Sequence, residues 1–289
     1  MTQRAAKTGY GPTASVAVEQ YFPEDQRIIQ DDLAYQILPF GMRAFVQVMG
    51  IPIARDWMIN AAEKSAPGIW GGLMCRKRYI DEKLLESLDQ IEAVVNLGAG
   101  FDTRIYRFPA LARVPVWEVD QPENIAPKQA RLQNIFGAIP SHVQLVSIDF
   151  DKESLENKLT AQGYSLDEPT FFIWEAVTQY LTKEGVEATF AFLAKAAPGS
   201  RLAFTYVIQD FFKEDARLKS YERLYKQYVQ KNIWLFGLDP GDVAPFLNKF
   251  GWRVVEHLGY EELAEQYVKP TGRDLPSMPI ERMVYAEKV

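Results

Sequence analysis

From about residue 92 onward, short apolar runs alternate along the chain with longer amphipathic stretches. The apolar runs predict strands at 93–97, 114–119, 143–148, 170–174, 201–207, 252–257 and 281–286. The amphipathic stretches predict helices at 123–136, 152–161, 183–197 and 239–250. Strands that alternate with helices of this length predict a parallel sheet covered on both faces. Right-handed crossovers then make the fold a doubly wound α/β one.

The first 90 residues contain no run typical of a strand, and the spacing of their apolar positions predicts helices. The predicted helices are 15–21, 25–38, 45–62 with an interruption at Pro52, and 71–88. After the fifth strand, an insertion at 209–236 is rich in Tyr, Phe and Lys, and we expect it to be helical. Residues 269–279 contain three prolines and predict a loop. We therefore expect one integrated domain, with an N-terminal helical cover (1–90) and an α/β core (91–289) that carries a lid at 209–236.

The charge and the cysteine content exclude several classes of protein. The chain has 289 residues, of which 32 are basic and 38 acidic, and its net charge is −6. Nucleic-acid binding usually needs a basic excess, so we expect no nucleic-acid partner. Cys75 is the only cysteine, which excludes a disulfide within the chain and a cysteine-based zinc site. With only two histidines as well, we expect no bound metal.

The hydropathy pattern predicts no membrane segment. No stretch reaches the 18 or so consecutive apolar residues that a transmembrane helix needs. Residues 2–7 are largely polar and lead to Gly and Pro, not to the apolar core of a signal peptide. We therefore expect a cytoplasmic protein without a membrane partner.

Glycines and acidic residues follow the predicted strands directly. In a doubly wound sheet, ligands bind at the carboxyl ends of the strands, near the point where the strand order reverses. The residues at these ends are Gly98, Gly100, Asp120, Asp149, Phe150, Glu175 and Ala176.

Three of these positions suggest a nucleoside. A turn through Gly98 and Gly100 lets the backbone approach a ligand closely, because glycine has no Cβ. Asp120 lies 22 residues after Gly98, where a carboxylate can accept hydrogen bonds from both ribose hydroxyls. Asp149 can accept from an exocyclic amine such as that of adenine, beside the flat ring of Phe150. The combination is more specific than the glycine pair alone.

The glycine turn does not match the patterns of phosphate-binding loops. A dinucleotide fingerprint has a third glycine where this chain has Thr103, which disfavours a nicotinamide-dependent oxidoreductase. The Gly-Lys-Ser/Thr ending of a P-loop is absent too. A ligand with adenine and ribose but no phosphate fits better, and S-adenosylmethionine is such a ligand.

Several separated motifs are similar to one family. They are Arg-Lys-Arg-Tyr-Ile-Asp at 76–81, Val-Asn-Leu-Gly-Ala-Gly-Phe-Asp-Thr-Arg at 95–104, Glu-Val-Asp-Gln-Pro at 118–122, Asp-Phe at 149–150 and Trp-Glu-Ala-Val-Thr-Gln-Tyr-Leu at 174–181. In this order they resemble the leucine carboxyl methyltransferase family, which includes bacterial O-methyltransferases and the enzyme that methylates a protein phosphatase tail. Residues 31–34 resemble an early Asp-Pro motif of the family, with Asp32 where proline is usual.

The resemblance implies a seven-stranded methyltransferase sheet, mostly parallel with an antiparallel last strand, and S-adenosylmethionine without a metal. It implies that Gly98 lines the methionine part of the cofactor, Asp120 binds the ribose and Glu175 borders cofactor and substrate. An arginine at 76 or 78 would bind the cofactor carboxylate; helical placement favours Arg78, and Arg76 stays open. The full cofactor-binding set is Arg76, Arg78, Gly98, Gly100, Asp120, Gln121, Asp149, Phe150, Glu175 and Ala176.

Aromatic residues after the fourth and fifth strands suggest an acceptor pocket. Tyr206 ends the fifth predicted strand, and it and Glu175 are the candidate catalytic residues, mainly for positioning. Tyr221, Tyr225 and Tyr228 form a helical stripe that either packs on the body or faces an acceptor. The predicted substrate pocket comprises Tyr180, Tyr206, Phe211, Tyr225, Trp234 and Phe236.

Other polar residues have structural interpretations. Asp102 and Arg104 are expected to pair locally and fix the loop, and Thr103 is expected to cap the following helix. We expect His142 and His257 to be structural or exposed to solvent, and Cys75 to be buried.

We therefore expect a methyltransferase that acts on an oxygen of a small-molecule acceptor, such as a natural product. A carboxylate acceptor is already ionised at neutral pH, which agrees with the lack of an obvious histidine base, whereas a phenol or alcohol would need one. One alternative is methylation of a protein C-terminal carboxylate, although an early lysine of the phosphatase-specific enzyme has no match here. A second alternative is a binding module that takes up the cofactor without turnover.

Overall fold

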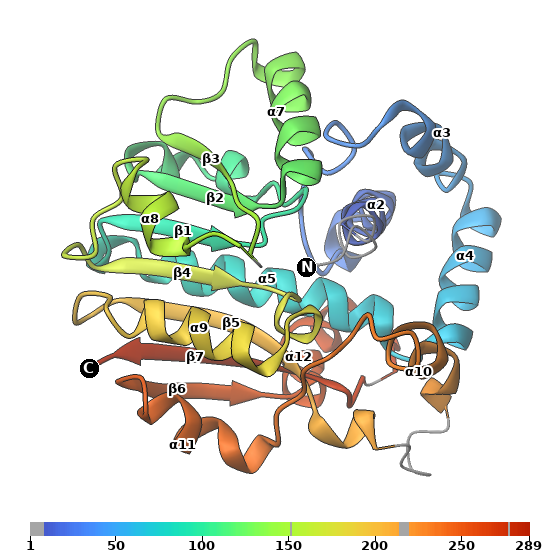
Figure 1. Ribbon diagram of the computed structural model, residues 1–289. Helices are drawn as coiled ribbons and strands as arrows, with labels where there is room; N and C mark the ends of the chain where they lie inside the picture. The colour runs from blue at the N-terminus through green and yellow to red at the C-terminus, as the bar shows by residue number, and fades with distance from the viewer. Residues whose placement is uncertain (1–8, 151, 214–219, 277) are drawn as a thin grey trace.

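The computed structural model describes residues 9–150, 152–213, 220–276 and 278–289. Its centre is one seven-stranded sheet with the strand order β3-β2-β1-β4-β5-β7-β6 (Figure 1). Neighbours among β1 to β5 are parallel, and β7 is antiparallel to both β5 and β6. The predicted doubly wound, mostly parallel sheet with an antiparallel last strand is confirmed. The strands are β1 (Ala93–Leu97), β2 (Val116–Asp120), β3 (Val143–Ser147), β4 (Thr170–Trp174), β5 (Arg201–Val207), β6 (Trp252–Leu258) and β7 (Glu281–Lys288).

Helices cover both faces of this sheet. Successive side chains of a strand point to opposite faces, so Val94 and Val95 of β1 belong to two different hydrophobic clusters. The cluster around Val94 includes side chains of α2, α5 and α12, and the cluster around Val95 includes side chains of α8, α9 and α11. The helices are α2 (Tyr10–Glu19), α3 (Phe40–Val48), α4 (Pro52–Ser65), α5 (Ile69–Glu86), α6 (Arg104–Arg107), α7 (Pro122–Phe136), α8 (Leu155–Thr160), α9 (Lys183–Leu193), α10 (Glu222–Tyr228), α11 (Val243–Asn248) and α12 (Tyr260–Tyr267).

Short 3-10 helices connect several of these elements. They are η1 (Glu24–Gln26), η2 (Leu88–Gln90), η3 (Pro109–Arg113), η4 (Thr178–Tyr180), η5 (Gln209–Phe212), η7 (Pro240–Asp242) and η8 (Lys269–Thr271). No helix in the described ranges has the length and apolar character needed to cross a membrane.

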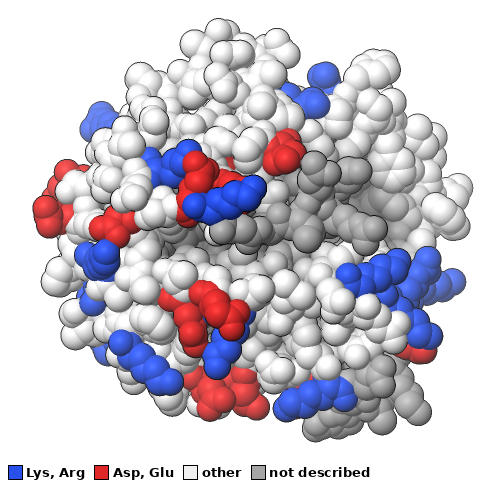
Figure 2. All heavy atoms as spheres, in the orientation of Figure 1, with Lys and Arg blue, Asp and Glu red and all other residues white. Residues whose placement is uncertain are grey.

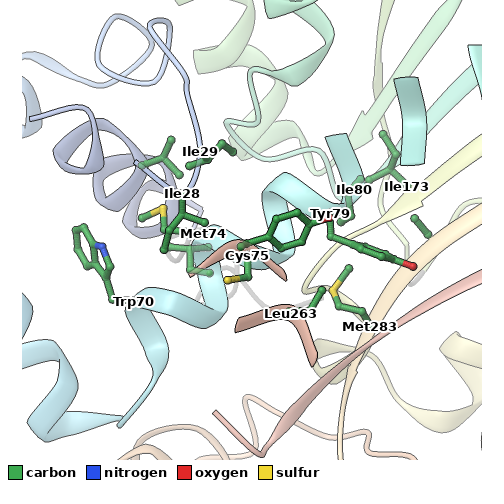
Figure 3. Packing of buried hydrophobic residues seen from close by; sticks show 14 of the residues in the cluster. Ile28, Ile29, Trp70, Met74, Cys75, Tyr79, Ile80, Ile173, Leu263 and Met283 are labelled. Atoms are coloured by element: carbon green, nitrogen blue, oxygen red, sulfur yellow. The ribbon is translucent and has the colours of Figure 1, made fainter. Parts of the chain in front are cut away.

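Helix α5 is the centre of the N-terminal part. Figure 3 shows Trp70, Met74, Cys75 and Tyr79 of this helix among side chains that come from the N-terminal segment, the sheet and α12. Burial raises the pKa of the Cys75 thiol to about 12, so the thiol stays protonated at neutral pH. The expectation that Cys75 is a buried residue is confirmed, since its exposed fraction is 0%.

The N-terminal helices differ from the prediction in one segment and agree with it at Pro52. The predicted helix at 25–38 is wrong, because this segment has only η1 followed by turns. The side chain of Asp31 accepts hydrogen bonds from the backbone N–H groups of Leu33 and Ala34, and such local bonds compete with a helix. Pro52 separates α3 from α4, since proline fits the first turn of a helix but not its interior.

Of two further segments towards the other end of the chain, one agrees with the prediction and one does not. The insertion at 209–236 is helical at η5, at residues 220–221 and at α10 among its described residues, and residues 214–219 lie outside them. Helix α12 was not predicted, although Tyr260, Leu263 and Tyr267 are buried with the i, i+3, i+7 spacing of one helix face. The side chain of Leu263 packs in the same cluster as α5 (Figure 3).

Candidate functional site

A cavity lies at the carboxyl ends of β1, β2 and β4. The chain leaves the adjacent strands β1 and β4 towards opposite halves of the sheet, which is where doubly wound folds bind ligands. The cavity has a volume of about 140 Å³. Its wall contains six of the predicted cofactor-binding residues, namely Arg76, Gly98, Gly100, Asp120, Glu175 and Ala176.

The glycine turn after β1 has a backbone that favours glycine. Gly98 and Gly100 have positive φ values of 73° and 44°. A Cβ on Gly98 would lie 2.3 Å from Cγ2 of Val177, a distance at which two carbon atoms overlap. The N–H groups of Gly98 and Ala99 both donate to the carbonyl oxygen of Val119, at 2.8 and 3.1 Å. The turn is therefore held against β2, with its backbone in the cavity wall.

Asp120 is fixed by three hydrogen bonds at the end of β2. Its Oδ2 accepts from the N–H of Gly100 at 2.6 Å, and its Oδ1 accepts from the N–H of Gln121 at 2.6 Å and from Nδ2 of Asn124 at 3.0 Å. Burial raises the pKa of Asp120, and these hydrogen bonds oppose the rise. Gln121 does not line the cavity; its contribution is the backbone N–H that orients the carboxylate.

A network of buried acids and bases surrounds the cavity, and we call it the acid–base cluster. Arg104, with an exposed side-chain fraction of 0%, lies at its centre. Its Nε is 2.8 Å from Oδ2 of Asp102, which confirms the expected local pair, and its Nη2 donates to Oε2 of Glu175 at 2.5 Å. The cluster consists of Asp31, Arg76, Lys77, Asp81, Asp102, Arg104, Arg107, Glu175 and Glu281.

Glu175 joins three cations in this cluster. Its carboxylate is 2.9 Å from Nε of Arg76, 3.3 Å from Nζ of Lys77 and 2.5 Å from Nη2 of Arg104. Burial on its own would raise the pKa of Glu175, but the three cations outweigh it and lower the pKa to about 2. Glu175 is therefore ionised at neutral pH and is poorly suited to take up a proton.

Arg76 and Arg78 have different surroundings, although both belong to α5. Arg76 lines the cavity; its Nε bonds Glu175 and its Nη1 bonds both oxygens of Glu281, at 2.7 and 2.8 Å. No hydrogen bond among the described residues uses Nη2 of Arg76. Arg78 is turned away from the cavity and bonds Glu82 and the carbonyl oxygen of Ile28. The structure thus places Arg76, and not Arg78, at the cavity. The prediction from helical placement had favoured Arg78 as the arginine that binds the cofactor carboxylate.

The structure does not bring Asp149 and Phe150 to this cavity. The carboxylate of Asp149 lies 3.0 Å from Nζ of Lys152, and its backbone N–H donates to Glu153. Phe150 lines another cavity of about 480 Å³ beside α8 and α9, whose wall has only Tyr180 in common with the first. The adenine role of these two residues stays a prediction that the arrangement of the chain does not support.

A larger cavity of about 490 Å³ adjoins the first. The two cavities share part of their walls, namely Pro12, Arg76, Ala176 and Tyr180. Of the predicted substrate pocket, Tyr180 and Trp234 line the larger cavity, whereas Tyr206, Phe211, Tyr225 and Phe236 do not. The sequence analysis missed Trp70, Leu73 and Met278 in this wall, because their apolar side chains have no signal that distinguishes them from core residues. Tyr228 of the predicted stripe also lines it.

Ala176 has a strained backbone at the boundary of the two cavities. Its φ is 55°, in the left-handed region that a residue with a Cβ seldom adopts. The N–H of Ala176 donates to Oγ1 of Thr205 at 2.8 Å, which helps to hold this conformation. Such strain is often found at functional sites, where surrounding contacts maintain it.

Two predicted roles are corrected by the side-chain contacts. Tyr206 is fully buried, lines neither cavity, and its hydroxyl pairs with Nε2 of His257 at 2.8 Å, so it cannot touch an acceptor there. Burial raises the pKa of Tyr206, which further disfavours it as a base. Thr103 is at the N-cap position of α6, but its hydroxyl donates to Asp31 at 2.5 Å instead of capping the helix.

Comparison with known proteins agrees with this geometry. The model of the family described as leucine carboxyl methyltransferase matches residues 10–194. The chain belongs to the leucine carboxyl methyltransferase family. A protein of Mycobacterium avium (strain 104) is 31% identical over 264 residues, which cover 88% of this chain and 83% of that protein. A protein of Mycobacterium tuberculosis (strain H37Rv) is 28% identical over 258 residues, covering 85% and 83%. Both relatives are named as candidate S-adenosyl-L-methionine-dependent methyltransferases.

Solved structures share the fold at low sequence identity. A candidate methyltransferase from Thermobifida fusca is 17% identical, with a TM-score of 0.58, and the match covers 81% of this chain and 88% of that one. A protein from Streptomyces avermitilis is 13% identical with a TM-score of 0.53, covering 80% and 88%. The sheet is therefore that of a methyltransferase family, and the relatives support S-adenosylmethionine as the methyl donor.

The charged residues of the cavity in this protein are compatible with S-adenosylmethionine as the methyl donor. The charged residues that line the cavity are the carboxylates Asp102, Asp120 and Glu175 and the bases Arg76 and Lys77, a formal charge of −1. S-adenosylmethionine carries a sulfonium and an ammonium cation, which an acidic excess attracts. Its single carboxylate can be bound by Arg76 through the unused Nη2. Asp120 would accept from the ribose hydroxyls.

We expect Gly98→Ala to be much more destabilising than Gly137→Ala. Both glycines have positive φ, 73° and 80°, so alanine costs about 1–2 kcal/mol of backbone strain at each. Only Gly98 adds overlap with Val177, since a Cβ on Gly137 meets nothing within 4 Å. Calorimetry should show a clearly larger fall in Tm for Gly98→Ala. Equal falls would contradict the close packing of this turn.

We expect Asp120→Ala to lower S-adenosylmethionine affinity by at least about a hundredfold, roughly 2.7 kcal/mol, in isothermal titration calorimetry. Asp120→Asn keeps an acceptor for Gly100 and should retain the fold, as circular dichroism can verify. Asp167→Ala, at an exposed loop position, is the control and should bind like the wild type. Unchanged affinity in both Asp120 variants would refute the ribose assignment.

We expect stability to fall between about pH 4.5 and about pH 2. Folding lowers the pKa of Glu175 from its ordinary 4.5 to about 2, so its ionised form contributes stability that is lost as the pH falls through this range. In urea unfolding measured against pH, Glu175→Gln should be less stable than the wild type at neutral pH and should lose less stability in acid. Glu187→Gln, whose side chain on α9 is 46% exposed, should keep the wild-type slope.

Proposed function

We propose that the protein transfers the methyl group of S-adenosylmethionine to an oxygen of a small acceptor with an apolar body. The observation that carries this proposal is the wall shared by the two cavities, formed by Pro12, Arg76, Ala176 and Tyr180. The smaller cavity has an acidic excess that suits the cofactor, and its Asp120 can accept hydrogen bonds from a ribose. The larger cavity has the apolar wall typical of small-molecule pockets.

The larger cavity suits an acceptor with an aromatic or other apolar body. Its described wall is formed mainly by apolar and aromatic side chains from α5, α10 and the segment before β7. Tyr228 stacks on Trp234 with ring centroids 4.7 Å apart, and Tyr180 meets Trp234 edge-on at 6.3 Å. The charged residues of the wall, Arg76 and Glu281, already pair with each other. We therefore propose an acceptor whose body is uncharged.

The proposed chemistry requires positioning more than proton transfer. When bound, the cofactor supplies a methyl group on a cationic sulfur that an acceptor oxygen can attack directly. Arg76 and the backbone of Ala176 border both cavities, so they can orient the two reactants in line. The apolar side chains around the acceptor exclude water from the reacting oxygen.

The residues around the cavities favour an acceptor that is already ionised. Glu175 and Glu281 both form ion pairs with Arg76, and Asp120 accepts three hydrogen bonds. His142 and His257 line neither cavity. A carboxylate needs no base at neutral pH, so we propose carboxylate methylation in preference to methylation of a phenol or alcohol.

The first experiment is a radiolabelled-methyl screen with matched carboxylic and phenolic acceptors of similar apolar bodies. We expect turnover with carboxylic acids and a labelled product that releases methanol on mild base treatment, as methyl esters do. A base-stable product would identify a methyl ether and refute the carboxylate preference. Cofactor binding without methyl transfer to any acceptor would refute the small-molecule proposal. Methyl transfer to a peptide C-terminus alone would refute it as well.

We expect Tyr228→Ala to raise KM for the acceptor by about tenfold, roughly 1.4 kcal/mol, with little change in cofactor affinity. Tyr228 lines the larger cavity and stacks on Trp234, whereas Tyr225 of the same helix lines neither cavity. Tyr225→Ala is therefore the matched control and should change the acceptor KM less than twofold. If both variants weakened the binding of acceptor and cofactor equally, α10 would be acting through the stability of the protein and not as part of the acceptor pocket.

A further inference from the structure

Helices α3 and α4 follow each other along the chain with residues 49–51 between them, and together we call them the hairpin; their outer surface is apolar and exposed. Between residues 40 and 65, Asp56 and Lys64 are the only charged residues at exposed positions, although 24% of the chain is charged. The other exposed polar positions are Gln47 and Asn60. The large apolar side chains on this surface, between 46% and 82% exposed, are Phe40, Phe45, Val48, Ile51, Ile53 and Trp57. We call these six side chains the hairpin patch.

The hairpin itself contributes little to the core of the protein. Val46 is the only buried residue of α3, and α4 has none over its 14 residues. The inner side of α4 packs Ala54, Met58 and Ile59 against the core, and its outer side presents Ile53 and Trp57. In Figure 1 the two helices form one edge of the molecule, and in Figure 2 the upper part of the corresponding edge is mostly white, with a group of Lys and Arg atoms below it.

The area of the hairpin patch suits a stable protein interface. Six side chains of this size and exposure present roughly 700 Å² of accessible surface, more than the 300–600 Å² of the largest patch on a typical monomer. A standard interface buries about 800 Å² on each partner. The patch with its immediate surroundings therefore provides about the area that one subunit needs.

The composition of the hairpin patch favours a second copy of the chain over a lipid surface. Helices that bind membranes in the plane of the interface carry exposed Lys and Arg beside the apolar side. On α3 and α4 the one exposed basic residue is Lys64, near the end of α4. Arg43 and Arg55 are half-buried, and Arg55 lies over the ring of Phe22 at 4.3 Å and donates to the carbonyl oxygen of Tyr21. Interfaces between identical subunits are more apolar and contain few charges, as this patch does.

We propose that the protein forms a twofold-symmetric dimer in which the hairpin patch packs against the same patch of a second copy. Such an interface is self-complementary, and each residue near the axis is opposite its own counterpart or a close neighbour of it. Dimerisation would cover the exposed side of α4. The inner side of α4 contributes Ala62 to the larger cavity, so, resting on the proposed function, the dimer would also support the wall of the acceptor pocket.

The test is the mass of the protein in solution, by sedimentation velocity and light scattering at micromolar concentrations. We expect the wild type to have twice the 33.0 kDa mass of the chain. Ile53→Lys and Trp57→Lys should be monomers, because twofold symmetry places two added charges in each interface. These side chains are 82% and 72% exposed, so their replacement should leave circular dichroism and cofactor binding unchanged. Val255→Lys, on β6 and also exposed, is the control and should remain a dimer.

Three outcomes would overturn the dimer. They are a monomeric wild type at these concentrations, a dimer that survives both hairpin substitutions, and open-ended assembly into larger species. Flotation with phosphatidylcholine vesicles adds a fourth: a monomeric wild type that floats, while Trp57→Lys does not, would assign the patch to lipid. Cofactor binding and methyl transfer are measured on the same samples, so a failed dimer and a failed methyltransferase assignment give different results.

Discussion

The buried ion pair between Arg104 and Glu175 is the contact on which the site depends. It joins the loop after β1 to the end of β4, across the crevice where the cavity lies. Glu175 also binds Arg76 and Lys77 of α5, so one carboxylate positions the N-terminal helices on the sheet. Loss of one partner from a buried pair leaves an uncompensated charge and typically costs about 3–5 kcal/mol. The helical cover and the sheet are therefore coupled through the same groups that line the cavity.

The strands were predictable because they are short apolar runs, and β1, β2 and β4 also end at or just before a glycine or an acidic residue. The errors arose where a side chain competes with the backbone or where tertiary contacts select the structure. Asp31 binds its own following N–H groups, so 25–38 is not a helix. Helix α12 is short, and packing of Leu263 against the cluster around α5 supports it more than its local pattern does.

The site was predictable only to the extent that topology determines it. Gly98, Asp120 and Glu175 end neighbouring strands, so the strand order alone brings them together. Whether Arg76 or Arg78 reaches the cavity depends on how α5 is rotated about its axis relative to the sheet. The sequence does not determine this rotation. Tyr206 also ends a strand, but its side chain points into the layer where His257 lies, and the sequence has no signal for that.

The position of β7 determines how β6 and the wall between the two cavities are joined to the sheet. β7 lies between β5 and β6, and in the described residues β6 pairs only with β7. β6 is therefore attached to the sheet only through β7, which follows it in the chain. Glu281, the first residue of β7, then pairs with Arg76. Glu281 lines the larger cavity and Arg76 lines both, so the wall that the two cavities share is complete only once β7 has joined the sheet.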